Sequence, residues 1–273
     1  MTEGRKQPLD APTLDQIKEW VLQAGVILRL RYGQNHTVEH KGEIDLVTEA
    51  DRRSEAFLIG HIRDAFAQDT IVAEESGPLN GNGAGRWYLD PLDGTTNFTH
   101  GLPIFAISLA YADAQGLRLG VVYDVMHQEL FSAERGRGAW LNDAPIHTSA
   151  SAELVDSLLV TGFPYDLHTS AENNLDNFAR FALRAQGVRR LGSAALDLCY
   201  VAAGRFDGYW EIKLSPWDYA AGALIAQEAG AQVTDIDGGP NYLVPPCSIL
   251  VANPTLHAKM LAVLREGQAQ KAG

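Results

Sequence analysis

The residues best suited to chemistry lie in the segment DPLDGTTNF, residues 90–98, which directly follows a short apolar run. The segment carries two carboxylates, Asp90 and Asp93, three positions apart. Pro91 fixes one backbone dihedral angle and Gly94 permits a tight bend, so both carboxylates can converge on one point. A Pro-x-Asp-Gly sequence is also common in plain surface turns. Taken alone, the segment fits such a turn at least as well.

Two other acids stand where elements of secondary structure should begin or end. Glu74 follows the apolar run 70–73, which predicts a short buried strand. Asp218 follows Ser215 and Pro216, a good N-cap and a good first helical residue, so it should lie in the first turn of a helix. In that turn Asp218 could also serve only as a capping acid, worth less than about 1 kcal/mol when exposed.

The electrostatic cost of bringing these acids together points to a metal ion. Each pair of unit charges at ~4 Å repels by about 4 kcal/mol at an effective dielectric constant of ~20. A divalent cation would remove that cost, and ligands that are all oxygen atoms suit Mg²⁺ or Mn²⁺ better than Zn²⁺. The acids concerned are Glu74, Asp90, Asp93 and Asp218.

The apolar pattern predicts the elements that position these acids. A capping box of Thr13 and Gln16 should begin a first helix that ends before Gly33. The remaining predicted elements of the first half are a helix from Thr48, strands over 70–73 and 87–89, a mobile loop over 76–85, and β-hairpins over 104–112 with 117–123 and over 130–134 with 138–141. In the second half we predict strands over 158–161, 188–191, 208–211, 233–236 and 249–252, and helices over 171–186, 193–203, 217–229 and 255–265.

This order of elements predicts a layered α/β sandwich rather than a barrel. A chain of 273 residues is near the upper size for one hydrophobic core. We therefore expect a flexible leader over 1–12 and a single domain over 13–273, with approximate subdomains 13–150 and 151–273.

The composition of the chain limits the class of protein and the kinds of molecule that it can bind. The apolar fraction of 46% excludes a disordered or fibrous protein. A formal net charge of −12 without a basic stripe argues against direct nucleic-acid binding. No apolar run is long enough to span a membrane and no secretory signal opens the chain, so we expect a soluble cytoplasmic protein. Cys199 and Cys247 fit neither a disulfide framework nor a zinc site, and we predict two buried, reduced thiols.

Four blocks of the sequence together resemble the inositol monophosphatase family. DPLDGTTNF (90–98) resembles its first signature, and WDYAAG (217–222), continuing to EAG (228–230), resembles its second. DLVTEAD (45–51) and AEES (73–76) match two further family blocks in the same order, and the similarity extends from about the first helix to the last.

The resemblance implies alternating α and β layers, a homodimer, and Mg²⁺-dependent, lithium-sensitive hydrolysis of phosphate monoesters. It implies that the metal ligands are Glu74, Asp90, Asp93, Asp218 and the carbonyl of Leu92. Thr95 and Asp51 would position and activate the attacking water, a sensible pairing because a hydroxyl is a poor base without a carboxylate behind it. Asp51 could also act as a capping acid three residues after Thr48.

The residues expected to contact the substrate are Gly94, Thr95, Gly192, Ser193, Ala194 and Glu211. Gly94 and Thr95 should begin a helix whose N–H groups face the phosphate, and Glu211 could read inositol hydroxyls or be an exposed acid at a strand end. Lys41 could approach the phosphate, whereas His100 fits a loop. Alternative substrates are histidinol phosphate, fructose 1,6-bisphosphate and 3′-phosphoadenosine 5′-phosphate, and an alternative role is regulatory binding on the same fold. No Gly-x-Ser-x-Gly motif supports a serine nucleophile, and no EF-hand loop supports a calcium module.

Overall fold

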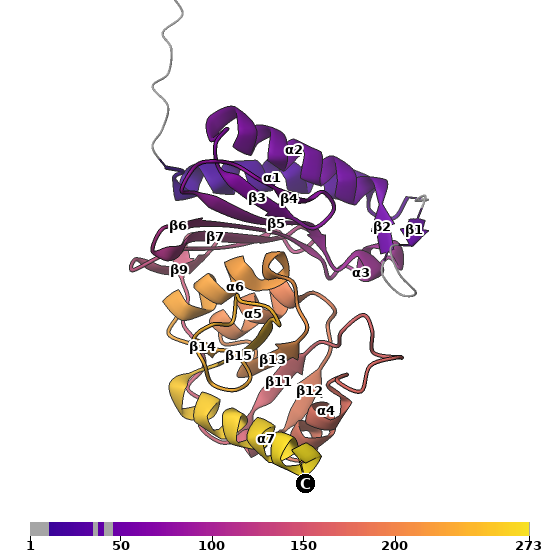
Figure 1. The fold of residues 1–273 in the computed structure, drawn as a ribbon, viewed down its shortest axis with the longest axis vertical. Helices are drawn as coiled ribbons and strands as arrows, with labels where there is room; N and C mark the ends of the chain where they lie inside the picture. Colours follow the sequence, from indigo (N-terminus) through magenta and orange to yellow (C-terminus); the bar gives the residue numbers. More distant parts are fainter. Residues whose placement is uncertain (1–10, 35–37, 41–45, 273) are drawn as a thin grey trace, which may run out of the picture.

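The computed structural model describes residues 11–34, 38–40 and 46–272. Its helices are α1 (Leu14–Arg31), α2 (Glu49–Ala65), α3 (Thr95–Thr99), α4 (Leu175–Ala182), α5 (Ala194–Ala202), α6 (Pro216–Glu228), α7 (Pro254–Ala272) and the short 3-10 helix η1 (Leu154–Asp156). Helices and sheets alternate in layers: α1 with α2, an eight-stranded sheet, α5 with α6, a five-stranded sheet, and α4 with α7 (Figure 1). This arrangement confirms the predicted layered α/β sandwich.

The eight-stranded sheet has the order β10-β9-β8-β7-β6-β5-β3-β4. Its strands are β3 (Thr70–Ala73), β4 (Gly77–Leu79), β5 (Arg86–Asp93), β6 (Ala106–Asp113), β7 (Gly116–Asp124), β8 (Glu129–Glu134), β9 (Gly138–Leu141) and β10 (Ala144–Pro145). Neighbours are antiparallel except β3 and β5, which run parallel. The predicted hairpins are β6–β7 and β8–β9.

The five-stranded sheet has the order β12-β11-β13-β15-β14. Its strands are β11 (Leu158–Thr161), β12 (Gly187–Arg189), β13 (Gly208–Ile212), β14 (Gln232–Thr234) and β15 (Ser248–Ala252). β11 runs parallel to β12 and β13, and the other pairs are antiparallel. A separate pair, β1 (Val38–His40) and β2 (Leu46–Thr48), leads into α2.

The largest apolar cluster lies between the two sheets and is built around α5 and α6. It combines residues of β6 and β7 with residues of the five-stranded sheet, so both sides of position 150 share one core. α1 and α2 cover the other face of the eight-stranded sheet. β6 is therefore buried on both faces, which explains why its sequence is apolar apart from Ser108 and the terminal Asp113. The single-domain organisation stays a prediction that this shared core supports.

The predicted helix over 171–186 is wrong in length, because α4 spans only Leu175–Ala182. Asn174 stands before α4 with a left-handed backbone, at φ 68°, and is buried. Its side-chain amide donates to Thr161 Oγ1 at 3.0 Å and to the Gly162 carbonyl at 2.8 Å. These contacts with β11 hold residues before 175 in turns, and a local apolar pattern could not reveal them.

Other differences are local. The segment 76–85, predicted as a mobile loop, contains β4, and the Gly83 N–H donates to the Gln68 carbonyl at 2.6 Å. The capping box at α1 is half formed, because Thr13 accepts from the Gln16 N–H while Gln16 Oε1 is buried without a partner among the described residues. β12 and β14 end two residues early, and α7 begins and ends outside the predicted bounds.

Several minor predictions can be compared directly. Cys199 and Cys247 are buried and unpaired, as predicted. His100 is the C-cap of α3. Lys41 and residues 1–10 of the predicted leader lie outside the described residues. Among the helices of the described part of the chain, none is long and apolar enough to cross a membrane.

Candidate active site

Glu74 and Asp90 are brought together by two parallel strands. Ala73 of β3 pairs with Leu89 of β5, and the Glu74 N–H donates to the Leu89 carbonyl at 3.1 Å. The two acids occupy the next position on neighbouring strands, and their carboxyl groups share a hydrogen bond. The pairing therefore places two acids side by side at one edge of the sheet.

A bulge in β5 separates Asp90 from Asp93. Asp90 pairs with Ser108 and Asp93 with Ala106, so the register shifts between them. The Leu92 N–H donates to Asp90 Oδ1 at 2.9 Å, which closes the turn. The strand predicted over 87–89 is longer than expected, because β5 continues through the bulge to Asp93.

Asp93 connects the end of β5 to the beginning of α5. Its Oδ2 accepts from Ser193 Oγ and from the Ala195 N–H, both at 2.7 Å. Nearby, the Asn97 amide donates to the carbonyls of Ile104 and Leu191, both at 2.8 Å. These bonds join the segment 90–98 to the predicted substrate-contacting segment that begins at Gly192.

Asp218 lies in the first turn of α6, as predicted. Ser215 is the N-cap and Pro216 the first residue, and Ser215 and Asp218 form a capping box. The Ser215 N–H donates to Asp218 Oδ2 at 2.7 Å. Ser108 of β6 donates to the Trp217 carbonyl at 3.3 Å and so links this turn to the eight-stranded sheet.

Thr95 and Asp51 form a hydrogen-bonded pair. Thr95 Oγ1 donates to Asp51 Oδ1 at 2.9 Å and lies 3.1 Å from the Leu92 carbonyl oxygen. Asp51 Oδ2 accepts from the N–H and hydroxyl of Thr48, in the capping box that begins α2. Asp51 therefore combines the two roles that the sequence suggested, because one of its oxygens caps α2 and the other accepts a hydrogen bond from Thr95. Gly94, which precedes this short α3 turn, has φ 99°.

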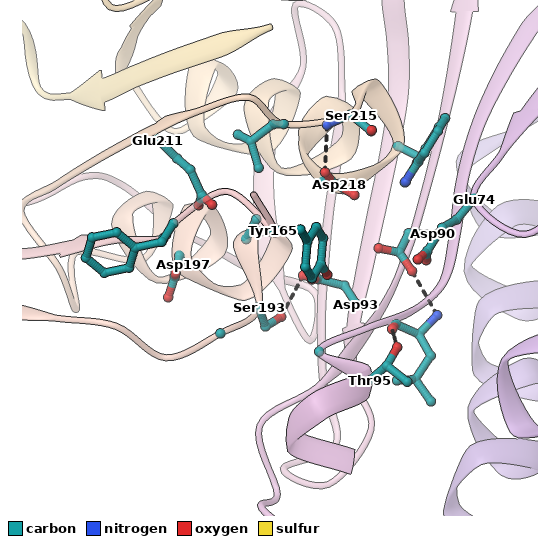
Figure 2. Close-up of a pocket in the computed structure, with 18 of the residues that line it drawn as sticks. Glu74, Asp90, Asp93, Thr95, Tyr165, Ser193, Asp197, Glu211, Ser215 and Asp218 are labelled. Carbon is teal, nitrogen blue, oxygen red and sulfur yellow. Dashed lines mark hydrogen bonds between the residues drawn. The ribbon is translucent and has the colours of Figure 1, made fainter. Parts of the chain in front are cut away.

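One cavity of about 220 Å³ contains all but one of the predicted site residues. Its predicted lining residues are Glu74, Asp90, Leu92, Asp93, Gly94, Thr95, Gly192, Ser193, Ala194, Glu211 and Asp218. Asp51 lies behind Thr95 and reaches the cavity only through it. Figure 2 shows Glu74 and Asp90 at one end of the cavity and Glu211 at the other.

Glu211 is buried, with 7% of its surface exposed, so the alternative of an exposed strand-end acid is wrong. Tyr209 OH donates to its Oε2. The backbone of Gly162 packs directly on its carboxylate, since a Cβ at position 162 would come within 2.1 Å of Oε2. Glu211 is therefore held against β11 by a residue that offers no side chain.

The acids of the cavity repel one another. Burial, with the charges of Glu74 and Asp93, raises the pKa of Asp90 well above its usual range. Burial also raises the pKa of Asp93 from 3.8 to about 6, and raises the pKa of Asp218 well above its usual range. Desolvated like charges of this kind become stable when a cation lies between them.

The donor set fits a hard divalent cation, because it consists of carboxylate and carbonyl oxygens. In the described part of the chain, no three His, Cys, Asp or Glu side chains are arranged to hold an ion as they stand. Backbone and hydroxyl donors hold one oxygen of Asp90, of Asp93 and of Asp218. The second oxygen of each would have to turn towards a shared ion.

These pKa shifts predict how the stability of the metal-free protein depends on pH. Acids whose pKa is raised by folding stabilise the protein below their unfolded pKa, and that contribution is lost as pH rises through the folded value. For Asp93 this window runs from about 3.8 to about 6. In excess chelator, we expect Tm to fall by roughly 5 °C between pH 4.5 and pH 7.

Thermal unfolding with and without Mg²⁺ checks this expectation. Mg²⁺ should raise Tm more at pH 7 than at pH 4.5, because it binds the ionised acids of the folded protein. Asp93→Asn should flatten the fall seen in chelator. An equal response to Mg²⁺ at both pH values would contradict the cation site.

The lining residues that were not predicted as site residues include Phe163, Tyr165, Arg190, Asp197 and Lys213. Asp197 had a usable signal, because it is the only charged residue of the apolar segment 194–203. The others come from loops and strand ends whose sequences carry no comparable pattern.

Comparisons with known proteins identify a family and relatives that match most of the chain. The family model described as "Inositol monophosphatase family" matches residues 10–269. A relative named inositol-1-monophosphatase, from Synechocystis sp., is 43% identical over 270 residues, covering 97% of this chain and 94% of the relative. A relative named Nus factor SuhB, from Escherichia coli K12, is 43% identical over 247 residues, covering 89% and 92%.

The fold agrees as well. The structure of the inositol monophosphatase from Anabaena (Nostoc) sp. is similar with a TM-score of 0.84 and 42% identity, covering 93% of this chain and 95% of that one. The match of family model, sequence and structure extends over nearly the whole chain. The chain belongs to the inositol monophosphatase family.

Proposed function

We propose that this protein hydrolyses a phosphate monoester in a Mg²⁺-dependent reaction, and that the substrate is myo-inositol monophosphate. The observation that carries the proposal is one cavity that joins the four acids, Glu74, Asp90, Asp93 and Asp218, to the Thr95–Asp51 pair. The first group fits a cation and the second can accept a proton from water. Hydrolysis of a phosphate ester needs both.

The cation would be held by the four acids and the Leu92 carbonyl, and it would neutralise phosphate charge and lower the pKa of a bound water. Thr95 directs its hydroxyl hydrogen to Asp51, so its oxygen can accept a hydrogen bond from the attacking water. As the water oxygen bonds to phosphorus and the ester P–O bond breaks, the water proton passes to Thr95 Oγ1 and the Thr95 proton to Asp51. The leaving alkoxide takes a proton from solvent.

Asp51 is suited to receive that proton. Burial raises its pKa, although the hydrogen bonds from Thr48 and Thr95 oppose the rise. A carboxylate with a raised pKa is a stronger base than an exposed one. Its second oxygen is fixed by Thr48, so the oxygen facing Thr95 keeps its direction.

The charge of the protein also favours a metal-dependent reaction. The chain has a net charge of −12, and the described residues that line the cavity include several acids and two cationic residues, Arg190 and Lys213. Lys213 already pairs with Asp166 at 2.8 Å. A phosphate group would be repelled unless a divalent cation offset the acids.

Replacing Glu211 tests the choice of substrate. If its carboxylate accepts hydrogen bonds from ring hydroxyls, Glu211→Ala should lower kcat/KM for inositol monophosphate by roughly 10- to 150-fold. It should barely change kcat/KM for p-nitrophenyl phosphate, which has no hydroxyls to offer. Equal losses on both substrates would mean that Glu211 supports the fold or the metal site.

Gly162→Ala tests the same carboxylate without removing it. The new Cβ would displace the tip of Glu211, a movable group, so Tm should change by less than about 3 °C. We expect a selective loss on inositol monophosphate that is smaller than the loss in Glu211→Ala. An unchanged ratio of kcat/KM between the two substrates would show that the position of Glu211 does not matter.

A panel of phosphate esters, each assayed with Mg²⁺ and with chelator, tests the proposal as a whole. Inositol monophosphate should give the highest kcat/KM. Preference for histidinol phosphate, fructose 1,6-bisphosphate or 3′-phosphoadenosine 5′-phosphate would correct the substrate and keep the reaction class. Lithium inhibition and a homodimer remain predictions from the family resemblance, and a cytoplasmic location remains a prediction from the sequence.

A second candidate is a regulatory role on the same fold, favoured by the name Nus factor that the Escherichia coli relative carries. The two roles separate in a cell that depends on this protein. The variant Thr95→Ala, which should keep the fold, would still support growth of that cell if regulation is the required role. The variant would not support growth if hydrolysis is required.

A further inference from the structure

Asp197 is a buried carboxylate with an oxygen that the protein does not satisfy. It lies in α5 with 1% of its surface exposed, and its Oδ1 has no hydrogen-bond partner among the described residues. Two other acids of this region differ. Asp93 accepts two hydrogen bonds, and Asp124 accepts three from His127 and Tyr200.

The helix does not explain why an acid stands at this position. Ser193 caps α5, and Asp93 binds the Ala195 N–H, so donors of the first turn already have acceptors. The helix dipole favours an acid there only weakly. An unsatisfied buried carboxyl costs more free energy than the dipole returns, and Ala or Leu would pack better among the apolar neighbours in α5.

Asp197 belongs to the wall of the cavity, beside Glu211. The charge of Glu211 raises the pKa of Asp197, and the charge of Arg190 lowers the pKa of both acids, which line the same cavity. Figure 2 shows Asp197 and Glu211 together at the end of the cavity opposite Glu74. When the phosphate of a phosphate ester lies near Glu74, the organic part of the ester would therefore reach Asp197 and Glu211.

We propose that Asp197 is a specificity-determining residue that, together with Glu211, hydrogen-bonds two hydroxyl groups of a polyol phosphate. This inference rests on the proposed function and narrows it to substrates with at least two hydroxyls facing this wall. Burial and the charge of Glu211 raise the pKa of Asp197 well above its usual range. A neutral carboxyl can both donate to and accept from a hydroxyl, which suits a polyol.

Kinetics of Asp197→Ala on two substrates test the role. kcat/KM for inositol monophosphate should fall about 10-fold, the effect of one or two lost hydrogen bonds, and kcat/KM for p-nitrophenyl phosphate should stay within 2-fold. Asp197→Asn, which keeps a donor and an acceptor, should recover most of the activity. A selective loss on an amino-alcohol phosphate instead would identify an ammonium as the partner and overturn the proposal.

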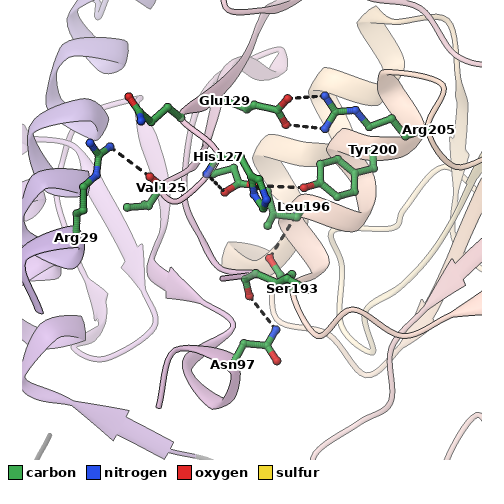
Figure 3. Close-up of polar contacts among 12 residues, drawn as sticks. Arg29, Asn97, Val125, His127, Glu129, Ser193, Leu196, Tyr200 and Arg205 are labelled. Atoms are coloured by element: carbon green, nitrogen blue, oxygen red, sulfur yellow. Dashed lines mark hydrogen bonds and ion pairs between the residues drawn. The ribbon is translucent and has the colours of Figure 1, made fainter. Parts of the chain in front are cut away.

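The melting temperature distinguishes the two roles, because it should rise in Asp197→Ala if Asp197 binds substrate and fall if Asp197 supports the fold. Asp197→Ala should raise the Tm of the substrate-free protein by about 2–4 °C, because it removes an unsatisfied buried group. Asp124→Ala is the matched control. It removes the acceptor of the Tyr200 and His127 contacts shown in Figure 3, and it should lower Tm. A fall in Tm for Asp197→Ala, with equal kinetic losses on both substrates, would make Asp197 structural.

Calorimetric binding of inositol monophosphate separates this inference from the proposed function. If the wild type releases no phosphate from any ester, the proposed function fails. The inference then stands only if the wild type binds inositol monophosphate and Asp197→Ala weakens that binding about 10-fold. If the wild type turns over inositol monophosphate and Asp197→Ala matches it, the inference alone fails.

Discussion

Thr95→Ala should lower kcat by roughly 10²-fold or more, with no recovery at high Mg²⁺ concentration. The hydroxyl of Thr95, a residue that lines the cavity, donates to Asp51 Oδ1 at 2.9 Å and so links that carboxylate to the cavity. Removing the hydroxyl breaks the path by which a proton leaves the attacking water, an effect of the size seen for general bases. Steady-state kinetics over a range of Mg²⁺ concentrations measure it.

Thr96→Ala is the matched control, because Thr96 is the next residue of the same turn and is exposed. It should keep kcat within 2-fold. Thr95→Ala is a cleaner test than a change at Asp51, which also caps α2 and would cost about 1 kcal/mol of stability. Restoration of Thr95→Ala by excess Mg²⁺ would show that Thr95 serves metal binding rather than water activation.

Asp93→Asn and Asp218→Asn should lose most activity at low Mg²⁺ and regain part of it at high Mg²⁺. Each change removes one negative charge from the cation site while keeping the shape of the side chain. The amide oxygen can still accept from Ser193 in the first variant and from the Ser215 N–H in the second. The fold should survive, and the Mg²⁺ concentration for half-maximal activity should rise at least 10-fold.

The melting temperatures of the metal-free variants provide a second test of this prediction. Both variants relieve repulsion between buried acids, so their Tm in chelator at pH 7 should rise above that of the wild type. Asp64→Asn, an exposed change in α2, should alter neither Tm nor the Mg²⁺ requirement. Unchanged Mg²⁺ dependence in Asp93→Asn and Asp218→Asn would remove both residues from the ligand set.

Elements with strong local signals were predictable from the sequence. The hairpin β6–β7 follows from two apolar runs around a short polar turn, and the start of α6 follows from Ser215 and Pro216. Elements whose bounds depend on distant contacts were not. α4 is short because Asn174 bonds to Thr161 and Gly162 on another element. No pattern within 171–186 records those bonds.

The residues of the candidate site also fall into those that could be predicted from the sequence and those that could not. The residues of the segment 90–98 were found because one motif carries them, and Glu74 because it ends a recognisable strand. Their meeting depends on the parallel register of β3 with β5, which is a tertiary fact. The burial of Glu211 depends on Gly162, which directly follows the neighbouring strand β11, and the importance of Asp197 depends on an oxygen left without a partner. Neither could be deduced from spacing.

The most direct test of the proposed function is phosphate release from inositol monophosphate by the purified full-length protein, first in excess chelator and then with Mg²⁺ added back. We expect no turnover in chelator, because the four acids repel the substrate when no cation offsets their charge. Added Mg²⁺ should restore turnover, and Thr95→Ala in the same assay should stay at least ~10²-fold slower. Full activity in excess chelator would contradict the proposal that hydrolysis depends on a divalent cation held by the four acids.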